Sequence, residues 1–186
     1  MTDKASLRKI CLASRAEIDP EERAAAQGKM CDFLLSMPEY KNAALLLSYI
    51  PTGDEIDVTP VIADALKSGK TVAAPVTLGK SMEFRVFRSF DELEKGSFGI
   101  MEPKSGKAAR NFENCFCITP ALCADRGFYR LGYGGGYYDR FFEEQSGIFS
   151  AALCFEKLRF EDIPRESGDV PVDCVVTEKE IYRRYC

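Results

Sequence analysis

The residues best suited to chemistry lie in a glycine-rich segment between Arg130 and Arg140, which reads R-L-G-Y-G-G-G-Y-Y-D-R. Four glycines occupy five consecutive positions, and such a main chain can adopt positive φ angles and come very close to a ligand. The segment leads into a predicted helix that begins at Tyr137, so its amide groups are expected to bind phosphate oxygens. Arg130 and Arg140 add positive charge on either side. This composition predicts a large anionic ligand.

Asp139 follows the glycines in the first turn of that predicted helix. A hard cation such as Mg²⁺ prefers carboxylate oxygens and its own waters, so Asp139 is expected to hold Mg²⁺ against bound phosphates. The alternative is a tight turn in which Asp139 is only a favourable charge near a helix start. The segment matches neither common phosphate loop, because it lacks G-x-x-x-x-G-K-[ST] and has Tyr137 at the last glycine of G-x-G-x-x-G.

The sequence contains no histidine. This excludes Ser-His-Asp and Cys-His nucleophile systems, H-E-x-x-H metalloproteases and C2H2 zinc fingers. Catalysis must therefore depend on carboxylates, Lys, Arg, Tyr, backbone amides or a metal held by oxygen atoms. Oxygen ligands favour Mg²⁺ over zinc.

The eight cysteines show no C-x-x-C spacing. The two that are close in sequence lie two residues apart in an apolar stretch, which places them on one face of a strand. Charged residues interrupt the apolar residues near the N-terminus, so no signal peptide is expected and the protein is predicted to be cytoplasmic. All eight are predicted to be buried free thiols: Cys11, Cys31, Cys115, Cys117, Cys123, Cys154, Cys174 and Cys186.

The overall composition limits the possible partners. The chain has 186 residues, of which 46% are hydrophobic, so one domain over residues 1–186 is expected. Its 25 Lys and Arg against 29 Asp and Glu give a net charge of −4, which argues against nucleic-acid binding. No apolar run approaches the ~20 residues that cross a bilayer, so no membrane partner is expected. The chain is expected to act as a monomer.

The elements that must position the glycine segment begin with two helices. Apolar residues recur at helical spacing between Leu7 and Ile18. Asp19-Pro20-Glu21-Glu22 is typical of a capping box that opens a second helix, which extends to about Leu35. The apolar run 43–50 predicts a strand buried on both faces. A helix over 59–69 and a strand over 71–75 complete a parallel β-α-β unit.

Further strands alternate with a helix along the rest of the chain. The stretch 95–110 is predicted to be a surface loop, and a helix is predicted from Tyr137 to about Gln145. This alternation predicts the α/β class, with a mostly parallel sheet and helices on both faces. The predicted strands cover residues 82–87, 115–119, 148–154 and, as the last one, 174–177.

The segment 130–140 resembles the signature of the 5-formyltetrahydrofolate cyclo-ligase family, and Lys4-Ala5-Ser6-Leu7-Arg8 is similar to its N-terminal K-x-x-L-R. Other blocks resemble the family in the same order along the chain: Tyr49 to Glu55, Gly69-Lys70 with Pro75, Gly99-Ile100 with Glu102-Pro103, and Pro171-Val172-Asp173 with Val175-Val176-Thr177. The resemblance implies a three-layer α/β/α fold. It also implies ATP- and Mg²⁺-dependent conversion of 5-formyltetrahydrofolate to 5,10-methenyltetrahydrofolate, with release of ADP and phosphate.

The resemblance also implies a role for individual residues. Arg130 and Tyr137 would be catalytic, and Asp139 and Asp173 would hold the metal. Ile50, Glu55, Tyr133 and Tyr137 would bind the folate. ATP would be bound by Lys4, Arg8, Arg130, Leu131, Gly132, Tyr133, Gly134, Gly135, Gly136, Tyr137 and Tyr138.

Three other functions remain open. A regulator that binds a nucleotide without catalysis would keep the glycine segment and need no folate pocket. A related kinase or ligase could act on another small acid. An RNA-binding accessory protein is disfavoured by the acidic composition and by the absence of an RNP-like pattern. Lys4 and Arg8 also fit a solvated helix face.

Overall fold

The computed structural model describes residues 3–96 and 99–185. Its centre is a seven-stranded sheet with the order β12-β11-β9-β6-β1-β2-β3. The inner strands from β11 to β2 are parallel, and the edge strands β3 and β12 are antiparallel to their neighbours. The strands are β1 (Leu45–Ser48), β2 (Thr71–Leu78), β3 (Ser81–Phe87), β6 (Cys115–Pro120), β9 (Ile148–Leu153), β11 (Cys174–Val176) and β12 (Ile181–Arg183).

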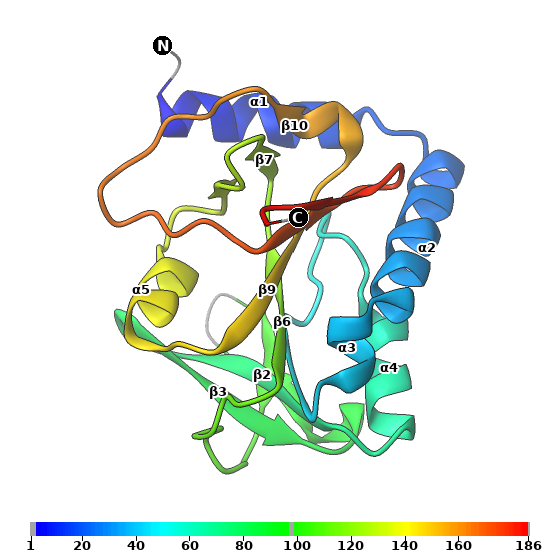
Figure 1. The fold of residues 1–186 in the computed structure, drawn as a ribbon, viewed down its shortest axis with the longest axis vertical. Helices are drawn as coiled ribbons and strands as arrows, with labels where there is room; N and C mark the ends of the chain where they lie inside the picture. The colour runs from blue at the N-terminus through cyan, green and yellow to red at the C-terminus, as the bar shows by residue number, and fades with distance from the viewer. Residues whose placement is uncertain (1–2, 97–98, 186) are drawn as a thin grey trace.

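Helices cover both faces of this sheet, as predicted, and form a three-layer α/β/α arrangement (Figure 1). Alternate residues of β1 face opposite layers, because successive side chains of a strand point to opposite faces. Leu46 packs in one cluster with Met30 and Ile62, whereas Leu47 packs in another with Phe141. The helices are α1 (Lys4–Ala16), α2 (Pro20–Ser36), α3 (Pro38–Asn42), α4 (Thr59–Lys67) and α5 (Tyr137–Glu144), with short 3₁₀ turns at Phe90–Glu92 and Glu156–Leu158.

The predicted N-terminal helices are confirmed, and the cap is formed as expected. The Asp19 carboxylate accepts hydrogen bonds from the amides of Glu21 at 2.9 Å and Glu22 at 3.2 Å. The expectation that only two helices precede the sheet is wrong, because the five-residue α3 follows α2. A helix of one turn is too short to show helical periodicity, although Pro38 at its first position is a typical start signal.

The stretch 95–110 is not only a loop. It contributes to a small hairpin of β4 (Leu93–Lys95) and β5 (Met101–Pro103), in which Glu94 pairs with Glu102. The strand over 174–177 is also not the last one, since β12 pairs with it. Strands of three residues are too short for alternation to be recognised in the sequence.

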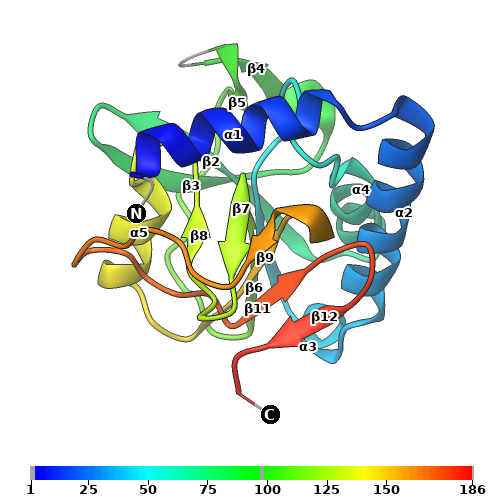
Figure 2. The same cartoon turned by 90° about the horizontal axis from the view of Figure 1, so that it is seen from above.

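A second small sheet, of order β10-β7-β8, supports the start of the glycine segment. It consists of β7 (Cys123–Asp125), β8 (Arg130–Leu131) and β10 (Arg159–Phe160). Figure 2 shows α1 crossing the top of the molecule, with β4 and β5 on one side and β7 and β8 on the other. The N-terminal helix therefore lies over the region where the predicted site residues meet.

The cysteines of the described residues agree with the sequence prediction. The seven cysteines of the described ranges are unpaired and buried, and Cys115 and Cys117 share one core cluster. Cys186, also predicted to be a buried thiol, lies outside the described residues. Within residues 3–96 and 99–185, no helix combines the length and apolar character that a bilayer crossing requires.

Candidate active site

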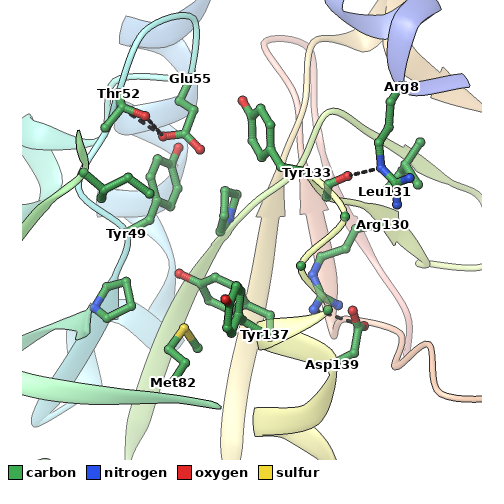
Figure 3. A pocket seen from close by; sticks show the side chains of 18 of the residues that line it. Arg8, Tyr49, Thr52, Glu55, Met82, Arg130, Leu131, Tyr133, Tyr137 and Asp139 are labelled. Atoms are coloured by element: carbon green, nitrogen blue, oxygen red, sulfur yellow. Dashed lines mark hydrogen bonds and ion pairs between the residues drawn. The ribbon is translucent and has the colours of Figure 1, made fainter. Parts of the chain in front are cut away.

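A cavity of about 740 Å³ lies where β1, β2 and β6 end, below α1. Open α/β sheets bind ligands at the carboxyl ends of their strands. Every residue predicted to bind ATP or folate lines this cavity, and Asp139 does so as well. Figure 3 shows Tyr49, Thr52 and Glu55 on one wall and Arg8, Arg130 and Asp139 on the other.

The glycine segment needs its glycines at two positions. Gly134 has a φ of +105° and Gly136 a φ of +63°, and both angles are in the left-handed region that L side chains rarely adopt. A Cβ atom on Gly134 would also lie 3.3 Å from Cζ of Arg8. The Arg8 guanidinium donates from Nε to the carbonyl of Gly132 at 2.9 Å, which ties α1 to the loop.

Arg130 and Asp139 form an ion pair at the base of the loop. Nη2 of Arg130 lies 3.2 Å from Oδ1 of Asp139, and only 3% of the Arg130 side chain is exposed. Both groups also bind the main chain of Val170. Arg130 donates to the Val170 carbonyl at 2.8 Å, and the Val170 amide donates to Oδ1 of Asp139 at 3.2 Å. Oδ2 of Asp139 accepts no hydrogen bond within the part of the chain that the structure describes.

Lys4 reaches the same end of the cavity from α1. Its Nζ lies 2.7 Å from both carboxylate oxygens of Asp169 and 3.4 Å from Oε2 of Glu166. Both acidic residues line the cavity. The sequence reasoning did not place them in the site, because they lie in an irregular segment with no periodic pattern.

Glu55 is fixed by the turn that follows β1. Its Oε2 accepts hydrogen bonds from the amide of Thr52 at 2.9 Å and from the Thr52 hydroxyl at 3.1 Å. Burial raises the pKa of Glu55, and the two bonds from Thr52 and the charge of Arg15 partly oppose this increase. The carboxylate is therefore partly desolvated.

Arg15 does not line the cavity, but it supports this wall through bonds to lining residues, and the sequence reasoning missed it. It is 1% exposed and donates to the carbonyl of Ala121, to the Tyr133 hydroxyl at 3.3 Å and to the carbonyl of Asp54 at 3.5 Å. The signal was present in the sequence, because Arg15 follows Leu7 and Cys11 at intervals of four residues on the apolar face of α1.

The two tyrosines that begin α5 have different surroundings. The Tyr137 hydroxyl donates to the carbonyl of Gly79 at 3.0 Å. The Tyr138 hydroxyl is buried and has no hydrogen-bond partner among the described residues. Arg140, expected to add charge to the phosphate site, instead donates to the carbonyls of Lys80 and Gly135, each at 2.8 Å, and is not among the cavity-lining residues. Its position three residues after Tyr137 directs it to the β2–β3 turn.

Asp173, the second predicted metal ligand, does not line the cavity. Its Oδ2 accepts hydrogen bonds from the amide of Ser150 at 2.7 Å and from the Ser150 hydroxyl at 2.8 Å. No group of three or more acidic or cysteine side chains within 3–96 and 99–185 forms a metal cluster. The structure thus brings Asp139 alone of the predicted pair into the cavity, and the role of Asp173 stays a prediction.

A sequence profile described as the 5-formyltetrahydrofolate cyclo-ligase family matches residues 1–178. The chain belongs to this family. It is similar to the 5,10-methenyltetrahydrofolate synthetase of Aquifex aeolicus, with a TM-score of 0.85 and 33% identity over 98% of this chain and 93% of that one. It is also 30% identical to the 5-formyltetrahydrofolate cyclo-ligase of Mycoplasma genitalium, over 76% of this chain and 77% of the relative.

A second solved structure shows the same fold at lower identity. The 5,10-methenyltetrahydrofolate synthetase of Mycoplasma pneumoniae matches with a TM-score of 0.77 and 18% identity, over 95% of this chain and 99% of that one. The family match confirms the resemblance found in the sequence. The names of the family and of these relatives indicate 5-formyltetrahydrofolate cyclo-ligase activity.

Proposed function

We propose that this cyclo-ligase family member converts 5-formyltetrahydrofolate to 5,10-methenyltetrahydrofolate and consumes ATP. One observation carries the proposal: a single cavity joins a loop suited to phosphates with an aromatic wall suited to a flat heterocycle. Phosphoryl transfer between two bound substrates requires that they lie together in this way. A kinase or ligase that acts on another small acid would also need the phosphate loop, but it would need a different wall for its second substrate.

The phosphate half combines side-chain cations with backbone amides. Lys4, Arg8 and Arg130 converge on the cavity, together with the loop from Leu131 to Tyr138. We propose that these residues bind ATP. The Lys4 ammonium now pairs with Asp169, and its exchange to a phosphate would keep the cation hydrogen-bonded.

The folate half consists of Ile50, Glu55, Tyr133 and Tyr137, which line the cavity together with Tyr49. Aromatic side chains offer flat surfaces for a pterin ring. Glu55 offers a carboxylate in a partly buried position, where a charge-assisted hydrogen bond gains strength.

Asp139 fits a magnesium site by its chemistry. It is a hard oxygen donor on the cavity wall, and its Oδ2 has no hydrogen bond from the described residues. Mg²⁺ in nucleotide sites uses one or two carboxylates and completes its coordination with phosphate oxygens and water. When bound, the ion would supply positive charge to balance the triphosphate.

The reaction needs positioning and charge balance more than a proton-transfer group. The formyl oxygen on N5 attacks the γ-phosphorus of ATP, and the bond to the β-γ bridging oxygen breaks to release ADP. N10 then attacks the formyl carbon, loses its proton, and expels the oxygen as phosphate to form the methenyl bridge. Arg130, which is held by Asp139 and Val170, would balance the charge of the transferred group, and Tyr137 would orient the folate.

The proposal also covers the oligomeric state of the enzyme and its location in the cell. A monomeric enzyme formed by a single domain over residues 1–186 stays part of the proposal, and the residues assigned to both substrates line one cavity of this chain. The described cysteines are unpaired, which supports a reducing, cytoplasmic environment.

The test is the absorbance of methenyltetrahydrofolate formed from 5-formyltetrahydrofolate, with ATP and Mg²⁺ supplied together and each omitted. We expect product only when both are present, also with zinc chelated at constant free Mg²⁺. Activity restored only by zinc would contradict the metal assignment. ATP binding without turnover of the folate would favour the regulator, and turnover of another acid would favour the rival kinase.

A further inference from the structure

Glu102 is a carboxylate of the cavity that has no role in the site described above. It lies on β5, lines the cavity, and is 8% exposed. It comes from the β4–β5 hairpin, so it enters the cavity from an element that contributes none of the predicted ATP, folate or metal residues.

The fold gives this buried charge little compensation. Oε1 of Glu102 accepts one hydrogen bond, from the amide of Thr77 at 3.4 Å, which is long for an N–H···O bond. Glu102 forms no ion pair with any residue of 3–96 or 99–185. Its cross-strand partner is Glu94, and like charges directly opposite each other destabilise a strand pair. Burial of an unpaired carboxylate is costly, so a purely structural role is poorly supported.

The surroundings hold the carboxylate in place without neutralising it. Gly96 leaves the space that it occupies, because a Cβ atom at Gly96 would lie 2.1 Å from Oε2 of Glu102. Pro75, Met82 and Ile100 line the same cavity with apolar surface. A ligand with a flat apolar body and N–H donors on one edge would complement this part of the wall.

Glu55 is the other carboxylate that could receive such donors, but one of its two oxygens is already well bonded. The turn supplies two hydrogen bonds to its Oε2, from the Thr52 amide and hydroxyl. Glu102 has a single long one. The group with the larger unmet demand for donors is therefore Glu102.

We propose that Glu102 recognises the 2-amino-4-oxo edge of the pterin ring, accepting hydrogen bonds from the 2-amino group and from N3–H. The two carboxylate oxygens match these two adjacent N–H donors, and the two hydrogen bonds would satisfy the buried carboxylate. This assignment rests on the proposed function and names the residue that selects the folate ring. Glu55 is left to contact the substrate elsewhere.

The test compares 5-formyltetrahydrofolate with its 2-desamino-2-methyl analogue, through kcat/KM in the wild type and in three variants. We expect the wild type to prefer the natural substrate by at least ~10-fold, as for a lost charge-assisted hydrogen bond. Glu102→Gln should lower kcat/KM for the natural substrate by ~10- to 100-fold, leave the KM for ATP unchanged, and abolish the preference. Glu55→Gln should weaken folate binding and keep the preference. Glu94→Gln, on the exposed strand partner, should change neither.

Gly96→Ala provides a second route to the same site. Its methyl group would displace the Glu102 carboxylate, and the φ angle of Gly96 is not in the positive range that excludes alanine. We expect it to reduce the preference for the 2-amino group, so the test does not depend on the folding of Glu102→Gln.

Two results would overturn the inference. One is equal use of both substrates by the wild type, and the other is a preference that survives in the variants at Glu102 and Gly96. A wild type that turns over neither compound would instead refute the proposed function.

Discussion

Replacement of Asp139 by asparagine tests the phosphate half of the cavity, because it removes one charge and changes the shape very little. Asparagine keeps a carbonyl oxygen that can accept the Val170 amide, now bonded at 3.2 Å. It loses the ion pair with Arg130 and is a much weaker ligand for Mg²⁺. The change therefore has a structural effect and a catalytic effect, which must be separated.

The structural effect follows from the burial of the pair. The side chain of Arg130 is 3% exposed and that of Asp139 is 25% exposed, so water compensates the loss only in part. Arg130 keeps its bond to the Val170 carbonyl and its position 5.3 Å from the centre of the Phe142 ring. We expect the free energy of unfolding to fall by about 1–3 kcal/mol, which is a decrease in Tm of about 2–12 °C for a chain of this size.

The catalytic effect should be larger. We expect turnover to fall by ~100-fold or more at a temperature where both proteins are folded, because charge balance at the transferred phosphoryl group is lost. Raising Mg²⁺ should recover part of the rate, and ATP binding measured by calorimetry should require more Mg²⁺. Near wild-type turnover in ordinary Mg²⁺ would refute the metal role. A slow variant with an unchanged Mg²⁺ requirement would show that Asp139 acts only through Arg130.

Three further predictions concern other residues. Because burial raises the pKa of Glu55 above its usual 4.5, the KM for folate should rise as the pH falls through that raised value. Glu55→Gln should show a ~5- to 100-fold higher KM for folate that no longer depends on pH in this range. The same pH dependence in the variant would refute the assignment. Arg15→Met should lower the free energy of unfolding, measured in urea, by about 2–4 kcal/mol, because the buried Ala121 carbonyl loses its donor. An unchanged urea midpoint would contradict this. Gly134→Ala should raise the KM for ATP more than Gly132→Ala does. The methyl group at position 134 adds about 1–3 kcal/mol of backbone strain beside Arg8, whereas the methyl group at position 132 meets open space. Equal effects of the two variants would contradict this prediction.

The fold and the site could be predicted from the sequence wherever the signal depends on neighbouring residues. The glycine segment, the cap at Asp19 and the β-α-β unit could be predicted because turn chemistry, capping and continuous apolar runs depend on neighbouring residues. The family resemblance then collected residues as distant as Lys4 and Asp139 into one cavity, and the structure places them there.

What could not be predicted depends on side-chain partners across the fold. The ion pair of Lys4 with Asp169 joins residues 165 positions apart, and no local pattern indicates it. Arg140 appeared to belong to the phosphate site by sequence proximity, but the helical turn of α5 directs it to the β2–β3 turn. Glu102 lay in a stretch taken for loop, so its burial could not be inferred.

The contacts between α1 and the glycine segment also determine when the cavity can be completed during protein synthesis. Lys4 and Arg8 are synthesised first, but their partners Asp169 and Gly132 are separated from them by 165 and 124 residues. At ~5–20 residues per second, translation reaches Asp169 roughly 8–35 s after Lys4. The first helix therefore waits through most of synthesis before both contacts can form. A nascent chain that stops before Asp169 leaves Lys4 without this carboxylate and Arg130 without the Val170 carbonyl. Helix α1, although synthesised before its partners, is therefore among the last parts of the cavity to be completed.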